Sequence, residues 1–299
     1  MPTLLFSHPA CLDHDPGEFH PECPDRLRAI THILEHEDFF YLAREEAPRA
    51  TMAQLLAAHS QSHIDHIFSL IPDGGGVVEL DGDTFVSRGS GEAALRAAGA
   101  CRNAFCSVRP PGHHAERAAA MGFCLFSNAA IGSLHARNVH GFQRVAVLDF
   151  DVHHGNGTQQ ILWDVPGMFY GSTHQQDAFP YTGTAEETGG EGGAIVVNVP
   201  LAAGSGSASF RAAWADVILP RLRAFGPDFL IVSAGFDAHA ADPMAYLRLQ
   251  VADFEWLSRE LVTVAAGCGN RLVSVLEGGY DTRALAACVA AHVRVLMGG

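Results

Sequence analysis

The chain has 299 residues, of which 48% are hydrophobic, and it carries a formal net charge of −14 at pH 7. This length and composition are typical of a globular enzyme and exclude a disordered or fibrous chain. The negative charge disfavours nonspecific binding to nucleic acid or an anionic membrane, and the complete lack of lysine excludes Schiff-base chemistry and a lysine-bearing phosphate loop.

Short apolar runs alternate with helical stretches along the chain. The expected strands are 3–8, 104–109, 144–151, 168–174, 194–200, 229–237 and 271–280. The expected helices are 91–103, 125–137, 208–225, 253–267 and 282–297. Because the strands are almost continuously apolar, they are expected to be covered on both faces. The pattern predicts a single α/β domain over 1–299, with one open, mostly parallel sheet flanked by helices on both faces.

The sequence argues against a membrane protein and against a protein held together by disulfides. It contains no run of about 18 apolar residues, as a membrane-spanning helix would need. The start MPTLLFSHPAC lacks the basic and long apolar regions of a signal peptide, so a cytoplasmic location is expected. The seven cysteines are an odd number and form no C-x-x-C pair, which argues against a disulfide framework and a zinc knuckle.

Several predicted strands end in polar or glycine-rich residues, as in DFDVHHGNGT at 149–158. Ligands of open α/β sheets bind beyond the carboxyl ends of the strands, so these endings are expected to converge on one site. Residues i and i+2 of a strand point the same way, which would place Asp149, Asp151 and His153 in one row. A carboxylate and an imidazole side by side suit a divalent metal, although a hydrogen-bonded Asp–His pair also fits this pattern.

A catalytic metal site needs about three protein ligands and an open position. Asp237 follows another predicted strand and is the best candidate for the third ligand, with His239 as its competitor. After the rigid turn of RPPGHHA, His113 and His114 can act as a base and an electrostatic partner beside an activated water. Tyr280 follows the two glycines of EGGY, and its phenol can donate to a developing oxyanion.

Together these motifs resemble the arginase–deacetylase superfamily, in particular the histone deacetylase family and its bacterial deacetylase-like amidohydrolases. The blocks that carry the resemblance are HPECPDR, RPPGHHA, GFCLFSN, DFDVHHGNGTQ, FPYTGT, SAGFDAH and EGGYD, which span most of the chain. The resemblance implies a three-layer α/β/α fold and hydrolysis of an N-acetyl amide. Asn156 and EGGYD follow the class II pattern, whereas class I members carry Asp at the position of Asn156.

The resemblance also implies the roles of individual residues. One zinc ion, or ferrous ion in its place, would be held by Asp151, His153 and Asp237. The catalytic set would be His113, His114, Tyr280, Asp149 and Asn156. In this set His114 would be the general acid–base, His113 would act electrostatically, and Tyr280 would polarise the amide carbonyl. A structural potassium ion is implied at main-chain oxygens of Asp149, Asp151, His153, Ser172 and Thr173.

A channel for the acyl-lysine side chain is implied as well. Its residues would be Gly122, Phe123, Phe179, Asp83, Met244 and Arg26. The two phenylalanines would form its walls, and the Gly122 carbonyl would accept a hydrogen bond from the substrate amide. Asp83 would hold the substrate backbone, although this block carries Arg88 where relatives usually have proline. Arg26 would line the exit for acetate, and a surface arginine is the alternative.

The leading hypothesis is therefore metal-dependent hydrolysis of an N-acetyl or other acyl amide, with acetyl-lysine in a protein or peptide, or a similar small amide, as the substrate. Polyamine-selective relatives carry a carboxylate where this chain has Met244, so acetylpolyamines or other acetylated small amines are the alternative substrates. A ureohydrolase would need two metal ions and more ligands than this chain shows. A noncatalytic acyl-lysine binder is the alternative from another class, and the presence of every expected ligand, both histidines and Tyr280 disfavours it. An oligomer is compatible with the sequence.

Overall fold

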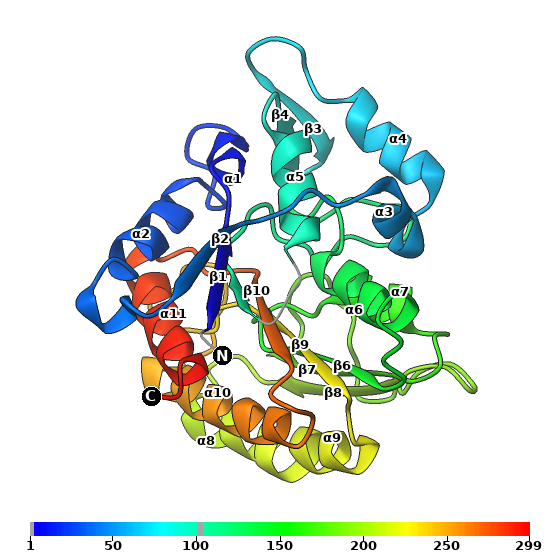
Figure 1. Cartoon of the computed structure of the whole chain (residues 1–299), viewed down its shortest axis with the longest axis vertical. Coiled ribbons are helices and arrows are strands. Elements are labelled where there is room, and N and C mark those ends of the chain that lie inside the picture. Colours follow the sequence, from blue (N-terminus) through cyan, green and yellow to red (C-terminus); the bar gives the residue numbers. More distant parts are fainter. Residues whose placement is uncertain (1–2, 101–103) are drawn as a thin grey trace.

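The computed structural model describes residues 3–100 and 104–299 (Figure 1). Its centre is an eight-stranded sheet of order β2-β1-β5-β10-β9-β6-β7-β8. Each neighbouring pair of these strands runs parallel. The strands are β1 (Leu4–Ser7), β2 (Ala43–Glu46), β5 (Ala104–Cys106), β6 (Val145–Asp149), β7 (Met168–Gln175), β8 (Ile195–Leu201), β9 (Phe229–Ala234) and β10 (Leu272–Leu276).

Helices cover both faces of this sheet. Before β6 they are α1 (Ala10–Asp13), α2 (Asp25–Ile33), the 3₁₀ turn η1 (Glu37–Phe39), α3 (Met52–Ala58), α4 (Gln61–Ser69), α5 (Ser90–Gly99) and α6 (Asn128–Asn138). After β6 they are α7 (Asn156–Leu162), α8 (Ser207–Ala212), the π-helical segment η2 (Ala213–Ile218), α9 (Leu219–Phe225), α10 (Val251–Ala266) and α11 (Thr282–Leu296).

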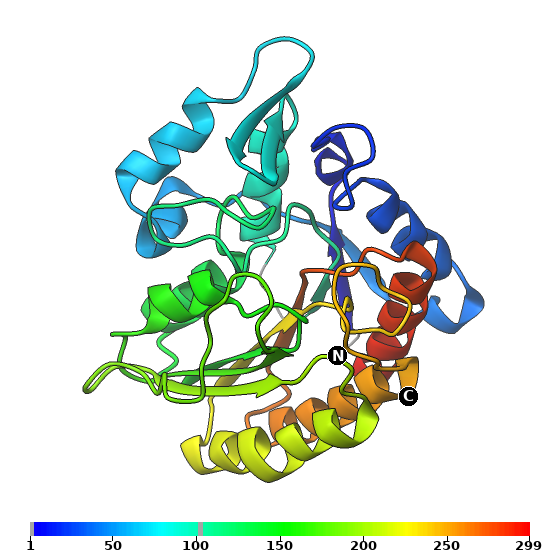
Figure 2. The ribbon, with the colours of Figure 1, turned by 180° about the vertical axis from the view of Figure 1, so that it is seen from behind.

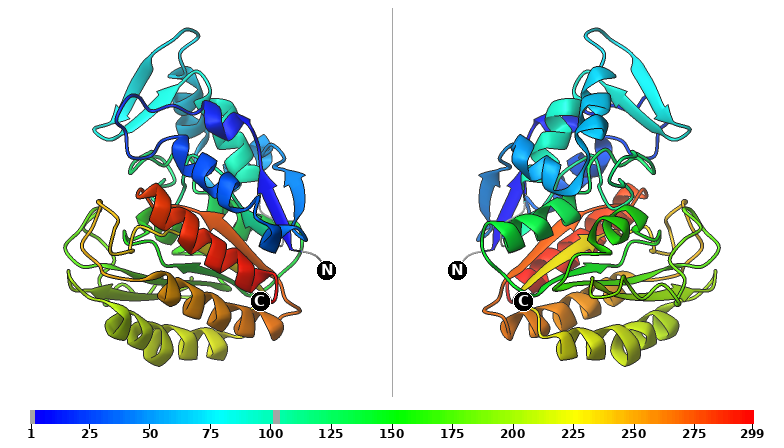
Figure 3. Two further views of the ribbon diagram at one scale, coloured as in Figure 1. Left: turned by 90° about the vertical axis from the view of Figure 1, so that its left-hand side faces the viewer. Right: turned by 90° about the vertical axis from the view of Figure 1, so that its right-hand side faces the viewer.

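The views in Figures 1 and 3 show α6 and α7 on one side of the sheet and α8, α9 and α10 on the other. Seen from behind, in Figure 2, α3, α4, α5 and a small hairpin rise from one end of the sheet. That hairpin pairs β3 (Val77–Asp81) with β4 (Thr84–Ser87) in antiparallel fashion. The predicted three-layer α/β fold is confirmed.

The core follows from the apolar strands. All five residues of β6 are buried, as are all five of β10, because helices cover both of their faces. Burying one valine or leucine side chain stabilises the fold by about 1.5–3 kcal/mol, so these central strands form a rigid base for the loops that follow them. Among the described ranges, no helix is both long and apolar enough to cross a bilayer.

Some predicted boundaries were wrong. The strands expected to reach residues 151, 237 and 280 end at Asp149, Ala234 and Leu276, where the chain turns into loops. Helices α1–α4 and α7 and strands β2–β4 were missed, because they are short. The helix expected over 91–103 ends at Gly99, and its last positions, 101–103, lie outside the described residues.

Candidate active site

The chain leaves β6 through two consecutive turns made by its own aspartates. Asp149 Oδ1 accepts a hydrogen bond from the N–H of Asp151 at 3.2 Å, and Asp151 Oδ1 accepts one from the N–H of His153 at 2.9 Å. Such aspartate turns compete with strand geometry, so the strand stops at Asp149. The alternation expected for a strand therefore does not apply here, and the turns bring Asp151 and His153 together instead.

Three buried side chains meet just beyond this turn. Asp151, His153 and Asp237 each offer one ligand atom, and these atoms lie within 4.8 Å of one another. His153 Nδ1 is 3.2 Å from Asp151 Oδ1 and 3.2 Å from Asp237 Oδ2. His239 is not part of this group, and its Nδ1 accepts a hydrogen bond from the N–H of Ala241. Of the two candidates for the third ligand, the structure brings in Asp237.

The donor set fits a divalent cation. Asp237 Oδ1 accepts the N–H of Val152 at 2.9 Å, but its buried Oδ2 accepts no hydrogen bond from any described residue. Burial and the neighbouring Asp151 raise the pKa of Asp237 to about 7. A buried carboxylate oxygen without a donor is costly unless a cation lies against it. Two carboxylates and one imidazole are ligands that zinc and ferrous ions accept.

Glycines let the backbone close over this cluster. The N–H of Gly278 donates to Asp151 Oδ2 at 2.8 Å. A Cβ at Gly278 would lie 2.1 Å from Asp237 Oδ2, and one at Gly235 would lie 2.0 Å from Asp151 Oδ2. No side chain fits at either position, so both glycines are needed for the carboxylates to reach this place.

His113 is held from two sides. Its Nδ1 lies 3.1 Å from Asp149 Oδ2, which also accepts the phenol O–H of Tyr170 at 3.1 Å. Its backbone N–H donates to Glu277 Oε2 at 3.1 Å, and the N–H of Gly112 donates to the same oxygen at 2.7 Å. Glu277 therefore ties the loop that carries the two histidines to the end of β10.

His114 is oriented by an amide with a fixed direction. Its Nδ1 lies 2.8 Å from Asn156 Oδ1. The Nδ2 of Asn156 donates to Glu116 Oε1 at 2.8 Å, which fixes the amide so that its oxygen faces His114. His114 Nδ1 must then carry the proton, and Nε2 is left as an acceptor. Glu116 supplies, one hydrogen bond further out, the negative charge that Asn156 lacks.

The two adjacent imidazoles differ in electrostatic environment. Their ring centroids are 4.0 Å apart. Burial lowers the pKa of His113, but Asp151 and Asp149 outweigh it and raise the pKa well above its usual value. For His114, burial together with the charges of His113 and His153 holds the pKa well below its usual value. Neighbouring groups with opposite shifts are typical of an acid–base pair.

Tyr280 is held by contacts of its backbone and of its ring. Asp242 Oδ2 accepts its backbone N–H at 2.6 Å and that of Asp281 at 3.1 Å, which fixes the start of α11. The guanidinium of Arg26 lies 4.9 Å from the centre of the Tyr280 ring. Burial raises the pKa of the phenol well above its usual value, so Tyr280 keeps its proton and is a hydrogen-bond donor. Arg26 is fully buried, so the alternative of a surface arginine is wrong.

Two aromatic rings flank these groups. The Phe179 ring lies 5.0 Å from that of His114, and the Phe123 ring lies 5.8 Å from that of Tyr280. Gly122 has a φ of 55°, and a Cβ there would lie 2.4 Å from His114 Cδ2 and 2.9 Å from Phe179 Cε1. The close packing of ring against backbone therefore requires glycine at this position.

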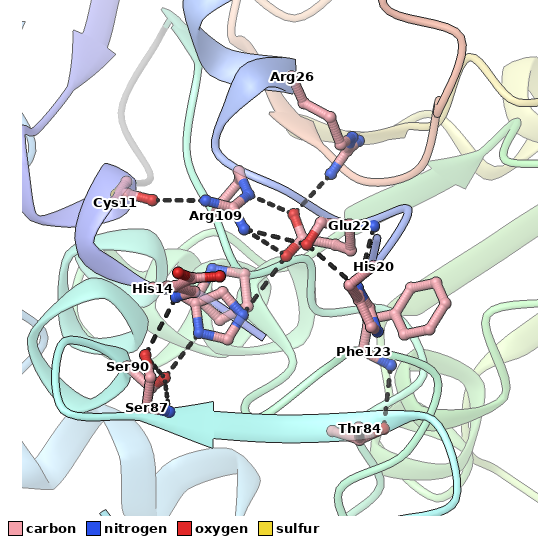
Figure 4. A network of polar contacts seen from close by, with 12 residues as sticks. Cys11, His14, His20, Glu22, Arg26, Thr84, Ser87, Ser90, Arg109 and Phe123 are labelled. Atoms are coloured by element: carbon pink, nitrogen blue, oxygen red, sulfur yellow. Dashed lines mark hydrogen bonds and ion pairs between the residues drawn. The ribbon is translucent and has the colours of Figure 1, made fainter. Parts of the chain in front are cut away.

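Asp83 and Met244 are the other residues predicted to contact the substrate. Asp83 is in the turn between β3 and β4, and the next residue, Thr84, accepts the N–H of Phe123 at 3.1 Å (Figure 4). His20 Nε2 is hydrogen-bonded to the Asp83 carbonyl at 3.1 Å. Met244 is half-buried, and its N–H donates to Asp242 Oδ1. The hairpin is thus attached to the same loops as Phe123.

Of the residues predicted to bind potassium, Asp149 ends β6 and Ser172 and Thr173 lie on the adjacent strand β7, whereas Asp151 and His153 lie in the loop after β6. Ser172 of β7 is paired in register with Asp149 of β6. The Ser172 hydroxyl is hydrogen-bonded to His174 at 2.9 Å, and the Thr173 hydroxyl accepts the indole N–H of Trp214 at 3.0 Å. The hydroxyl groups of Ser172 and Thr173 are therefore hydrogen-bonded to other side chains.

Sequence reasoning missed several residues of this site. Glu277, Glu116, Asp242 and Tyr170 all hold backbone or side chains of the candidate site in place. Glu277 is the first residue of the motif EGGYD, and Glu116 directly follows the motif RPPGHHA. Their positions in the sequence could therefore have identified them as residues of this site. Tyr170 and Asp242 carried none, because only the fold brings them to the site.

Comparison with known proteins agrees with this geometry. A family model described as "Histone deacetylase domain" matches residues 20–296. Histone deacetylase 14, chloroplastic, of Arabidopsis thaliana is 34% identical over 99% of this chain and 77% of that protein. The histone deacetylase-like amidohydrolase of Pseudomonas aeruginosa is 36% identical over 93% of this chain and 77% of that protein. The crystal structure of the HDA15 HD domain has a TM-score of 0.92 at 36% identity, covering 99% of this chain and 91% of that one. This chain therefore belongs to the histone deacetylase family of hydrolases.

Proposed function

We propose that the chain, as one catalytic domain, hydrolyses N-acetyl amides with a zinc or ferrous ion held by Asp151, His153 and Asp237. The observation that carries this proposal is the convergence of these three buried ligand atoms within 4.8 Å, with Asp237 Oδ2 lacking any hydrogen bond from a described residue. When bound, such an ion lowers the pKa of a coordinated water towards about 7 and polarises a carbonyl. A potassium ion near Asp149 and Ser172 is proposed as structural support.

His114 takes the proton of the attacking water in this proposal. Its Nδ1 is committed to Asn156, so Nε2 is free to accept that proton and later to deliver it to the leaving amine. His113, held by Asp149, acts electrostatically beside it. Tyr280 donates its phenol O–H to the carbonyl oxygen as negative charge develops there. Water is the nucleophile, so no covalent acyl-enzyme forms.

The substrate side chain lies between Phe123 and Phe179 in this proposal. Their positions against Tyr280 and His114 support an apolar channel that leads to the reacting groups. The Gly122 carbonyl accepts the substrate amide N–H, Asp83 holds the substrate backbone, and Arg26 lines the exit for acetate. Because Met244 is not a carboxylate, acetyl-lysine in a protein or peptide is preferred over an acetylated polyamine.

The experiment is a substrate panel measured with zinc-loaded and ferrous-loaded protein. The panel contains an acetyl-lysine peptide, acetylspermidine, and acyl-lysine peptides with longer acyl chains. We expect the highest kcat/KM for an acyl-lysine peptide. A higher kcat/KM for acetylspermidine would reject the preferred substrate but keep the chemistry. Binding of acetyl-lysine without turnover in either metal form would reject the chemistry itself.

A further inference from the structure

A second charged cluster, separate from the ligand triad, is centred on Glu22. Its carboxylate lies between two arginines, as Figure 4 shows. Arg26 Nη1 donates to Glu22 Oε1 at 2.9 Å, and Arg109 Nη2 donates to Oε2 at 2.7 Å. Arg109 Nε also donates to Oε1. All three side chains have an exposed fraction of 0%.

This cluster is expected to add little to the net free energy of folding. Buried ion pairs lose most of their Coulombic attraction to desolvation, and apolar residues of similar volume often serve equally well. Here two guanidiniums share one carboxylate, and the third neighbour is His14, whose Nε2 lies 3.4 Å from Oε2. Burial raises the pKa of Glu22, but Arg109, His14 and Arg26 outweigh it and lower the pKa well below its usual value. Glu22 is thus fixed as an anion inside the protein.

Arg26 connects this anion to the candidate site. Its Nε donates to the carbonyl of Gly279 at 2.6 Å, and its Nη2 donates to the carbonyl of Glu277. These two carbonyls flank Gly278, whose N–H donates to Asp151 Oδ2 at 2.8 Å. The same guanidinium faces the Tyr280 ring. Only a planar fork of donors, as in arginine, reaches both carbonyls while still pairing with Glu22.

We propose that Glu22 is a positioning residue for the reaction, acting through Arg26 on the segment from Glu277 to Tyr280. By holding Arg26, it fixes the Gly278 N–H against Asp151 and fixes the Tyr280 ring beside the channel. Through Arg109 it also anchors the start of the loop that carries His113 and His114. One carboxylate therefore sets the relative position of a metal ligand, the phenol and the histidine loop. This inference rests on the proposed function.

The test compares Glu22→Gln, which keeps the shape but removes the charge, with a matched control, Glu92→Gln. Glu92 also pairs with two arginines, Arg49 at 3.0 Å and Arg96 at 2.8 Å, but it lies half-exposed on α5. Two readouts are used: kcat and KM for the best substrate, and the rate at which a chelator removes zinc from the loaded protein. Circular dichroism establishes that each variant is folded.

Glu22→Gln is expected to lower kcat by about 10- to 100-fold with little change in KM, and to release zinc faster by about tenfold. Glu92→Gln should leave both readouts near wild type. The losses in the double variant Glu22→Gln, Arg26→Lys should be less than additive, because Glu22 acts in part through Arg26. Arg26→Lys also keeps Glu22 paired, so it reports on the connection if Glu22→Gln fails to fold.

The inference is overturned if folded Glu22→Gln has the kcat and the zinc-release rate of the wild type. It is also overturned if Glu22→Gln and Glu92→Gln lose kcat equally. Additive losses in the double variant would also contradict it. If the wild-type protein hydrolyses no substrate of the panel, the proposed function fails. The zinc-release comparison then still decides whether Glu22 positions the ligand cluster.

Discussion

The N–H of Gly278 donates to the carboxylate of Asp151 at 2.8 Å, so the glycine after Glu277 forms part of the wall of the ligand cluster. A Cβ at this position would lie 2.1 Å from Asp237 Oδ2 and 2.6 Å from Asp151 Oδ2. Backbone this close to two carboxylates leaves no room for any side chain. EGGY thus sets the geometry of the ligands as well as carrying Tyr280.

Gly278→Ala is therefore expected to disrupt the ligand cluster. The added methyl group must displace Asp237 or Asp151, and we expect bound zinc to fall well below one equivalent per chain, with at least a tenfold loss of kcat/KM. Elemental analysis and steady-state kinetics measure both effects. Gly74→Ala is the control, because a Cβ there meets no atom within 4 Å. Full zinc occupancy in Gly278→Ala would contradict this packing argument.

Tyr280→Phe tests the phenol without disturbing the ligands. The ring and its contact with Arg26 remain, and only the hydrogen bond to the carbonyl oxygen is lost. Removing one such donor costs about 10²–10³ in kcat. Zinc content should stay at the wild-type level. Wild-type turnover in this variant would show that Tyr280 does not polarise the carbonyl.

Asn156→Ala tests how His114 is oriented. Without the amide oxygen, the proton on His114 Nδ1 has no fixed partner, and we expect kcat to fall by about 10- to 100-fold while zinc stays bound. Gln160→Ala is a matched control, because Gln160 also donates an amide hydrogen bond to Glu116, at 2.7 Å. Its kcat should be close to wild type. Equal losses in the two variants would mean that Glu116, rather than the contact with His114, matters.

The buried His292 should make stability depend on pH. Its ring lies between the hydroxyls of Ser258 and Ser274, at 2.6 and 2.8 Å, and burial lowers its pKa to about 3. Unfolding restores a pKa of about 6.5, so between these values the unfolded state binds more protons. The stabilisation is complete above about pH 6.5 and is lost as pH falls, by up to about 1.4 kcal/mol per pH unit.

Urea unfolding at pH 7.5, 6.5 and 5.5 measures this loss. His292→Gln, which has no titrating group, should show a weaker dependence on pH in this range, although it is less stable at pH 7.5. An unchanged slope in the variant would mean that His292 does not contribute to the acid sensitivity. The other buried histidines then account for it, including His59 and His174, whose pKa values burial lowers to about 3.

Much of the fold could be predicted because the central strands are apolar along almost their whole length. The sequences VAVLD and LVSVL can be recognised as strands buried on both faces without knowing which strands pair with them. The short helices α3 and α4 and the edge strand β2 could not be predicted this way. Most residues of β2 are exposed, so its sequence lacks the apolar pattern that marks the other strands.

The candidate site could be predicted only in part. Asp151 and His153 stand two residues apart, a spacing that suits a divalent metal but also a hydrogen-bonded Asp–His pair, so the metal site was predicted mainly from the family resemblance. Asp237 was already the best candidate for the third ligand from the sequence, with His239 as its competitor, and the structure places Asp237 beside Asp151 and His153. Glu22 and Arg109 lie 87 positions apart in the chain, and only the fold shows that they form one cluster.

The central claim is that one divalent ion at Asp151, His153 and Asp237 is required for catalysis. The most direct test removes metal from the purified protein with a chelator, then measures acetyl-lysine peptide hydrolysis during titration with zinc or ferrous ion. We expect no measurable turnover in the stripped protein and full recovery at one equivalent per chain. Full activity in metal-free protein, or recovery only at two equivalents, would contradict this claim.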